Sequence, residues 1–128
     1  MIVGIGIDII EIHRMRAAID NPAFVRRIFT PAEISYCQSR GRQGAASFAA
    51  RFAAKEAVMK ALGTGLAGGG TWLEIETLPD GMGKPELTLS GSFGSLADSF
   101  GVSCIHVSLT HAQDYAAAQV LLWKGESK

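Results

Sequence analysis

The hydrophobic pattern is clearest in residues 51–62, where no glycine or proline interrupts a run of strong helix formers. We expect one long helix here, beginning near Ser47 and ending at Gly63. Because buried charges are costly unless they are paired or bind a charged ligand, Glu56 and Lys60 are the first candidates for chemistry. The alternative is an ordinary surface ion pair, four residues apart. One broad apolar face is formed at helical spacing by Ala53, Ala54, Ala57, Val58 and Ala61.

A second apolar stretch, residues 2–9, has the β-branched content of a strand. Its glycines, Gly4 and Gly6, indicate a close backbone approach or a bend. Asp8 is expected at the far end of this strand, among isoleucines. Such a carboxylate either caps the helix that follows or binds a metal ion.

The remaining pattern gives helices first and a strand-rich second half. Thr30, Pro31 and Glu33 form a helix start with a capping box, whereas residues 40–44 resemble a polar, mobile loop. The last strand is apolar on both faces, which predicts that it is buried. Helices are expected at residues 11–19, 24–28, 30–39 and 93–100, and strands at 73–78, 85–89, 103–110 and 115–123.

Composition narrows the class of protein. A chain of 128 residues, 48% apolar and 19% charged, is expected to fold as a single domain with a real core. Its net charge of zero argues against general nucleic-acid binding. No run has the pattern of a signal peptide or the length of a membrane span. Two cysteines without a CxxC motif fit a reduced, cytoplasmic setting.

The charges are unevenly distributed along the chain. Residues 1–60 carry nine Lys or Arg and five Asp or Glu, whereas residues 61–128 carry three and seven. A basic first half could attract an acidic partner or a phosphorylated small molecule; the alternative is a solvated face without a specific role. The arginines of this half include Arg14, Arg16, Arg26, Arg27, Arg40 and Arg42.

The residue types limit the possible chemistry. The three histidines lack zinc-ligand spacing, and no Gly-x-Ser-x-Gly nucleophile motif is present. The glycine-rich residues 63–70 could approach a phosphate or act as a connector, but they lack the Lys-Ser/Thr of a P-loop. Asp8 and Glu56 suit Mg²⁺, which accepts a few carboxylates together with waters and substrate phosphates. Lys60 could contact the same phosphates, so the set indicates chemistry on a pyrophosphate.

These residues form part of a longer ordered series of motifs. The sequence resembles the holo-acyl-carrier-protein synthase family of 4′-phosphopantetheinyl transferases over nearly its whole length. It differs at Leu109, where isoleucine is common, and in the richer glycine run at residues 68–70. The motifs are Gly-Ile-Asp at 6–8, Phe-x-x-Lys-Glu-Ala-x-x-Lys at 52–60, Gly-Thr-Gly at 63–65, Gly-Lys-Pro at 83–85 and Val-Ser-Leu-Thr-His at 107–111, followed by Tyr115, Ala116 and Ala118.

The resemblance implies a reaction and a fold. The expected fold is α+β, a small antiparallel sheet with packed helices, in a homotrimer with active sites between subunits. The phosphopantetheine arm of coenzyme A would move to a serine of apo acyl carrier protein, in support of fatty acid biosynthesis. Asp8 and Glu56 would hold Mg²⁺, and Lys60 would stabilise the leaving phosphate or supply its proton. Glu56, directly or through a metal-bound water, is the hypothesised base.

The resemblance also implies which residues contact the two substrates. It leaves open whether the carrier protein serves a fatty-acid or a polyketide pathway, whether acyl-coenzyme A is accepted, and which subunit supplies each part of the site. The rival functions are another Mg²⁺-dependent phosphoryl transferase or nucleotide hydrolase, and a binding module without activity. Arg51 and Lys55 could reach either phosphates or structural acids. Coenzyme A contacts are expected from Arg51, Lys60, Gly63, Thr64, Gly65, Lys84, Pro85, Ser108, Thr110 and His111, and carrier-protein contacts from Arg14, Met15, Arg16, Arg26 and Arg27.

Overall fold

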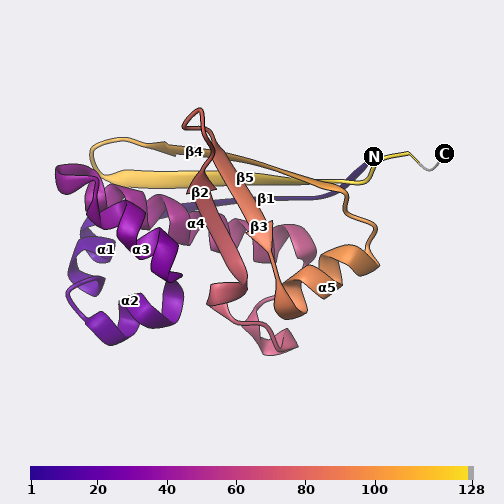
Figure 1. The fold of residues 1–128 in the computed structure, drawn as a ribbon, viewed down its shortest axis with the longest axis horizontal. Coiled ribbons are helices and arrows are strands. Elements are labelled where there is room, and N and C mark those ends of the chain that lie inside the picture. Colours follow the sequence, from indigo (N-terminus) through magenta and orange to yellow (C-terminus); the bar gives the residue numbers. More distant parts are fainter. Residues whose placement is uncertain (127–128) are drawn as a thin grey trace.

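A long helix lying across one face of an antiparallel sheet organises the chain (Figure 1). The computed structural model describes residues 1–126. The helix is α4 (Gly44–Leu62), and the sheet contains β1 (Ile2–Glu11), β5 (Tyr115–Trp123) and β4 (Cys104–His111) in the order β1-β5-β4. The expected α+β fold with a small antiparallel sheet is confirmed.

The other elements pack around α4 and the edge of this sheet. A hairpin of β2 (Ile75–Pro79) and β3 (Pro85–Leu89) forms a second, two-stranded sheet beside β4. The tip of this hairpin extends beyond the main sheet on the side away from α4 (Figure 1). The remaining helices are α1 (Ile12–Ala18), α2 (Pro22–Ile28), α3 (Pro31–Gln38) and α5 (Gly91–Ser99), with short 3-10 turns η1 (Gly41–Gln43), η2 (Leu66–Gly68) and η3 (Trp72–Glu74).

Local sequence signals fix several helix ends. At α3, Thr30 Oγ1 accepts a hydrogen bond from Glu33 N (3.2 Å) and Glu33 Oε1 accepts one from Thr30 N (3.0 Å), so the predicted capping box is confirmed. At the end of α4, Gly63 adopts φ 79°, a left-handed conformation that glycine enters without steric cost.

Two expectations about local structure are wrong, and one open alternative is decided. The helix α4 begins at Gly44, before Ser47, because the 3-10 turn η1 leads directly into it where a mobile loop was expected. The strand β2 begins only at Ile75, because Glu74 accepts hydrogen bonds from Thr71 and closes the turn η3. Of the two alternatives for Asp8, capping α1 is excluded, because β1 continues to Glu11 and Asp8 lies inside the strand.

The contact between β1 and α4 depends on two glycines. A Cβ atom on Gly4 would lie 2.1 Å from the carbonyl oxygen of Ala61, and one on Gly6 would lie 1.9 Å from that of Ala57. Any larger residue would push the strand from the helix, so the close approach predicted for this stretch is confirmed.

The sheet face turned away from α4, here called the outer face, is left uncovered by the chain itself. It carries Ile5, Ile7 and Ile9 of β1, which are 57%, 61% and 64% exposed. The prediction that β5 is buried on both faces is therefore wrong for a single chain, because α4 covers only the inner face, while Tyr115 and Trp123 stay exposed. Within residues 1–126, no helix combines the length and apolar character needed to cross a membrane.

Candidate active site

Asp8, Glu56 and Lys60 meet where β1 crosses α4. Asp8 lies two residues beyond Gly6 on the strand face that contacts the helix, since alternate residues of a strand share one face. The Nζ atom of Lys60 donates hydrogen bonds to Asp8 Oδ1 (3.0 Å) and to the carbonyl oxygen of Ile7 (2.9 Å). Glu56 lies one helical turn before Lys60. The structure therefore brings the three proposed catalytic residues together.

Glu56 lies in an electrostatic environment that disfavours its charge. Burial is the largest influence and raises the pKa of the Glu56 carboxyl, and the neighbouring negative charge of Asp8 raises it further. The ammonium of Lys60 opposes this shift but does not cancel it. Two carboxylates held together in this way attract a divalent cation or a proton.

An apolar cavity of about 340 Å³ opens beside these carboxylates. Asp8, Glu56 and Arg14 are its only charged lining residues. The ring of Phe52 stacks on that of Trp72, with centroids 5.1 Å apart. Phe52 lies one turn before Glu56, so helical spacing could have placed it in the site, whereas no local signal pointed to Trp72. The apolar lining comprises Ile9, Ile10, Met15, Ala18, Phe24 and Phe52.

The carboxylates fit a magnesium ion better than a transition metal. Within residues 1–126, no group of three or more His, Cys, Asp or Glu is arranged to hold a metal ion. Asp8 and Glu56 would supply two oxygen ligands, and the remaining positions would fall to waters and substrate oxygens, as Mg²⁺ prefers.

Arg51 and Lys55, the other basic residues of α4, are buried among protein groups. Lys55 Nζ lies 2.8 Å from Glu33 Oε1, and neither side chain is exposed. Arg51 donates from Nε to the carbonyl oxygen of Thr77 (3.1 Å) and from Nη1 to Ser47 Oγ (3.0 Å). Sequence reasoning identified Glu33 only as a helix cap and missed that it pairs with Lys55.

The residues expected to contact coenzyme A fall into separate groups. Arg51, Thr110 and His111 line one cavity of about 120 Å³ together with Arg40 and Tyr36. Lys84 and Pro85, at the start of β3, line another of about 260 Å³ that includes His106.

The loop at the end of α4 also carries expected coenzyme A contacts. Gly63, Thr64 and Gly65 lie three to five residues after Lys60, and Thr64 Oγ1 donates to the carbonyl oxygen of Gly65 (3.3 Å). This loop therefore starts within one turn of the Asp8–Lys60 pair.

Two predicted residues lie on the opposite face of the sheet from Asp8. Ser108 aligns with Gln119, which aligns with Ile7, and cross-strand neighbours share a face. Thr110 is two residues farther along the same face of β4. Ser108 and Thr110 are therefore on the outer face, whereas Asp8 contacts α4 on the inner face. A single chain does not bring these residues into one site.

Comparison with known proteins identifies the family. The family model of the 4′-phosphopantetheinyl transferase superfamily matches residues 4–120. The chain belongs to this superfamily. It is 50% identical to the holo-[acyl-carrier-protein] synthase of Trichlorobacter lovleyi over 95% of this chain and 98% of that protein. The resemblance found in the sequence is thus confirmed.

Solved structures of this transferase family share the fold. The Bacillus anthracis holo-(acyl-carrier-protein) synthase, crystallised in complex with CoA (3′,5′-ADP), is 39% identical, with a TM-score of 0.81, covering 98% of this chain and 99% of that one. The Neisseria meningitidis holo-[acyl-carrier-protein] synthase is 35% identical, with a TM-score of 0.85, covering 97% and 100%. The 4′-phosphopantetheinyl transferase fold predicted from the motifs is therefore confirmed.

In this transferase chain, the expected carrier-protein residues lie on α1 and α2. Arg14, Arg16, Arg26 and Arg27 are exposed, and Arg14 also lines the apolar cavity beside Asp8 and Glu56. Met15 is only 2% exposed, so its side chain belongs to the core and reaches ligands only through the cavity wall.

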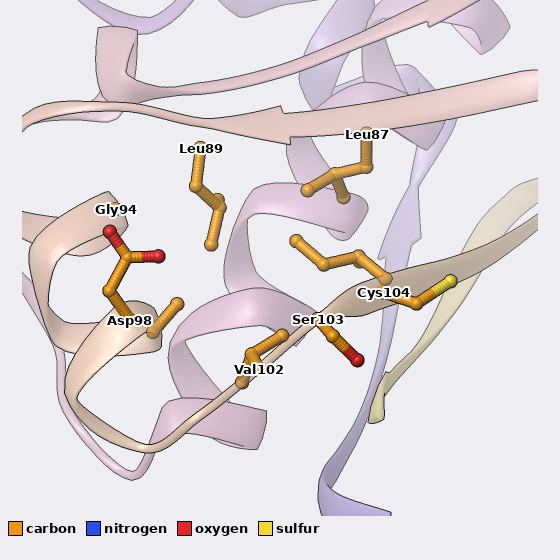
Figure 2. A pocket seen from close by; sticks show the side chains of 9 residues that line it. Leu87, Leu89, Gly94, Asp98, Val102, Ser103 and Cys104 are labelled. Atoms are coloured by element: carbon orange, nitrogen blue, oxygen red, sulfur yellow. The ribbon is translucent and has the colours of Figure 1, made fainter. Parts of the chain in front are cut away.

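Another cavity of the transferase, about 270 Å³, lies between β3, α5 and the start of β4 (Figure 2). Leu87 and Leu89 point from β3 toward Val102, while the sulfur of Cys104 is turned away from them. None of the residues predicted to bind coenzyme A, metal or carrier protein lines this cavity. The cavity beside Asp8 and Glu56 therefore remains the candidate active site.

Proposed function

We propose that this chain transfers the 4′-phosphopantetheine group of coenzyme A to a serine of apo acyl carrier protein, as a holo-[acyl-carrier-protein] synthase. The observation that carries this proposal is the meeting of Asp8, Glu56 and Lys60 beside an apolar cavity, in a chain of this superfamily. The attacking serine belongs to the carrier protein, so the chain needs no nucleophile of its own. The products are holo carrier protein and adenosine 3′,5′-bisphosphate.

In the proposed mechanism, Asp8 and Glu56 are the residues that would hold Mg²⁺. A bound Mg²⁺ would neutralise charge on the phosphate oxygens during displacement. Glu56 accepts the proton of the carrier serine, whose oxygen forms the new bond to phosphorus. The bond from phosphorus to the bridging oxygen breaks, and Lys60 stabilises the departing phosphate or protonates it.

We also propose that two copies of the chain complete each site in a homotrimer. Ser108 and Thr110 lie on the outer face, so they can join Asp8 and Glu56 only if another copy covers that face. The exposed isoleucines of β1 support this, because monomers rarely leave large contiguous apolar patches uncovered. Light scattering should give three times the 13.6 kDa of one chain, and Ile7→Glu should lower that mass. A wild-type mass of 13.6 kDa would reject the proposal.

The setting of the reaction is proposed on the same basis. We propose that residues 1–128 act as one transferase domain in the cytoplasm and supply carrier protein for fatty acid biosynthesis. The chain has only two cysteines and no CxxC motif, a composition typical of proteins in a reducing compartment. The exposed arginines of α1 and α2 would meet an acidic carrier protein.

Intact-protein mass spectrometry tests the reaction directly. Apo acyl carrier protein is incubated with the chain, coenzyme A and Mg²⁺, with parallel samples that contain EDTA or the Glu56→Gln variant. We expect a mass gain equal to phosphopantetheine in the first sample only. Coenzyme A cleavage without carrier modification would favour a hydrolase. Coenzyme A binding without any reaction, across several carrier proteins, would favour a binding module.

A further inference from the structure

The buried pair formed by Glu33 and Lys55 connects four parts of the fold. Lys55 Nζ donates to Glu33 Oε1 and to the backbone carbonyl oxygens of Trp72 (3.1 Å) and Ile75. Glu33 Oε2 in turn accepts a hydrogen bond from the backbone N–H of Thr77 (3.0 Å). The pair therefore fastens α3, α4, the turn η3 and β2 at one point.

This pair leads directly to the wall of the active-site cavity. The carbonyl of Trp72 binds Lys55, and the ring of Trp72 stacks on Phe52. Phe52 lines the cavity together with Glu56. Lys55 also precedes Glu56 in α4, and adjacent residues of a helix point about 100° apart. Fixing the direction of Lys55 consequently fixes the direction of Glu56.

Stability alone does not account for a charged pair in this place. Removing two charges from water costs about as much as their attraction returns, and apolar side chains of similar size often stabilise a core equally well. A buried ion pair with several hydrogen bonds does, however, define one arrangement of the groups around it.

We infer that Glu33 and Lys55 are positioning residues for the transfer reaction: together they fix the rotation of α4 and the Trp72–Phe52 stack, and thereby the placement of Glu56. Neither residue touches substrate, since both are fully buried. This inference rests on the proposed role of Glu56. It assigns Lys55, which directly precedes Glu56 in the sequence, to the protein interior and not to contact with a phosphate.

The test is a charge-neutral double variant, Glu33→Gln with Lys55→Met, which leaves no single buried charge behind. It is made in a Trp123→Phe background, so that Trp72 is the only tryptophan. We expect kcat to fall at least about tenfold and the Michaelis constant for coenzyme A to change less than about threefold. The emission of Trp72 should shift as its stack with Phe52 loosens. A kcat within about twofold of the background protein would overturn the inference.

A second variant keeps the test decisive if the double variant does not fold. Trp72→Leu retains the carbonyl that binds Lys55 and removes only the stack, and it should lower kcat in the same way. A folded Trp72→Leu protein with unchanged kcat would reject the proposed route.

The matched control is Val58→Ala, a fully buried change on the core side of α4. It should lower the melting temperature and leave kcat unchanged well below that temperature. Loss of kcat in proportion to stability, in Val58→Ala as in the double variant, would mean that the ion pair is merely structural. An active Glu56→Gln protein would instead refute the proposed site itself.

Discussion

The negative charge of Asp8 is compensated by Lys60 alone among its two neighbours on α4. Lys60 donates to its carboxylate, while the side chain that faces it from α4, Glu56, carries the same charge as Asp8. Among these three groups, two carboxylates and one ammonium leave a net negative charge, while Arg14, which also lines the cavity, lies 3.8 Å from the carboxylate of Glu11. This surplus is what a divalent cation would neutralise, and without a cation it is relieved by a proton.

The titration of Glu56 should report this surplus in the metal-free protein. Because burial and the charge of Asp8 raise the pKa of Glu56, its carboxyl should take up a proton above about 4.3, the ordinary value for glutamate. The ionised form costs free energy in the fold, so this cost is removed as pH falls through the raised pKa. Carboxyl-carbon NMR in EDTA follows the midpoint, and Asp8→Asn should lower it. A midpoint at or below the ordinary value would contradict the arrangement of charges.

Arg14 is the exposed arginine that lines the cavity beside Asp8 and Glu56. Its Nη1 atom lies 3.8 Å from Oε1 of Glu11. A pair this exposed contributes little stability, so Arg14→Ala should fold normally. We expect the Michaelis constant for carrier protein to rise about threefold to tenfold, with less effect at high salt, and coenzyme A binding to stay the same. Asp20→Ala, in the exposed turn that follows α1, serves as the surface control. An unchanged constant for Arg14→Ala would remove it from the carrier contact.

At the scale of elements, the crossing of β1 and α4 builds the site. The strand reaches the helix backbone at Gly4 and Gly6, and the next residue on that face, Asp8, then meets side chains in place of backbone. The glycines determine how closely the strand and the helix approach. Because they are close, the side chain of Asp8 reaches Lys60 on α4.

Replacing Gly6 should therefore damage the fold before it affects the chemistry. A Cβ atom 1.9 Å from the carbonyl of Ala57 must move backbone, so Gly6→Ala should lower the free energy of unfolding by about 1–3 kcal/mol or more. Gly81→Ala is the matched control, because no atom lies within 4 Å of its added Cβ, and it should change stability by less than about 0.5 kcal/mol. Urea denaturation measures both. Equal stability of the two variants would contradict the close contact.

Sequence predicted those elements whose signals are local. The signals for the capping box at Thr30, the glycine end of α4 and the helix predicted at 93–100 are each contained in a few neighbouring residues, and each feature is present. The pairing of Glu33 with Lys55 spans two helices and depends on tertiary packing, so no spacing rule could reveal it. For the same reason, the residue types of the site could be predicted from the sequence, but the location of Asp8 and Thr110 on opposite faces of the sheet could not.

At the scale of the whole molecule, one face of the sheet is covered by the chain itself and the other face is not. The inner face carries Asp8 and packs on α4, whereas the outer face exposes Ile5, Ile7 and Ile9. The tip of the β2–β3 hairpin extends past the sheet on this same outer side (Figure 1). In the proposed trimer, Lys84 and Pro85, which follow that tip, would meet another copy.

Mixing two impaired variants should decide whether copies share their sites. Glu56→Gln disables the inner-face group, and Ser108→Ala with Thr110→Ala weakens the outer-face group. If each site joins an inner face from one copy with an outer face from the next, random mixed trimers restore about a quarter of their sites to the wild-type composition. Unfolding and refolding the two proteins together, at low coenzyme A, should therefore recover activity that neither has alone. Sites contained within one chain would recover nothing, because every chain in the mixture carries a defect.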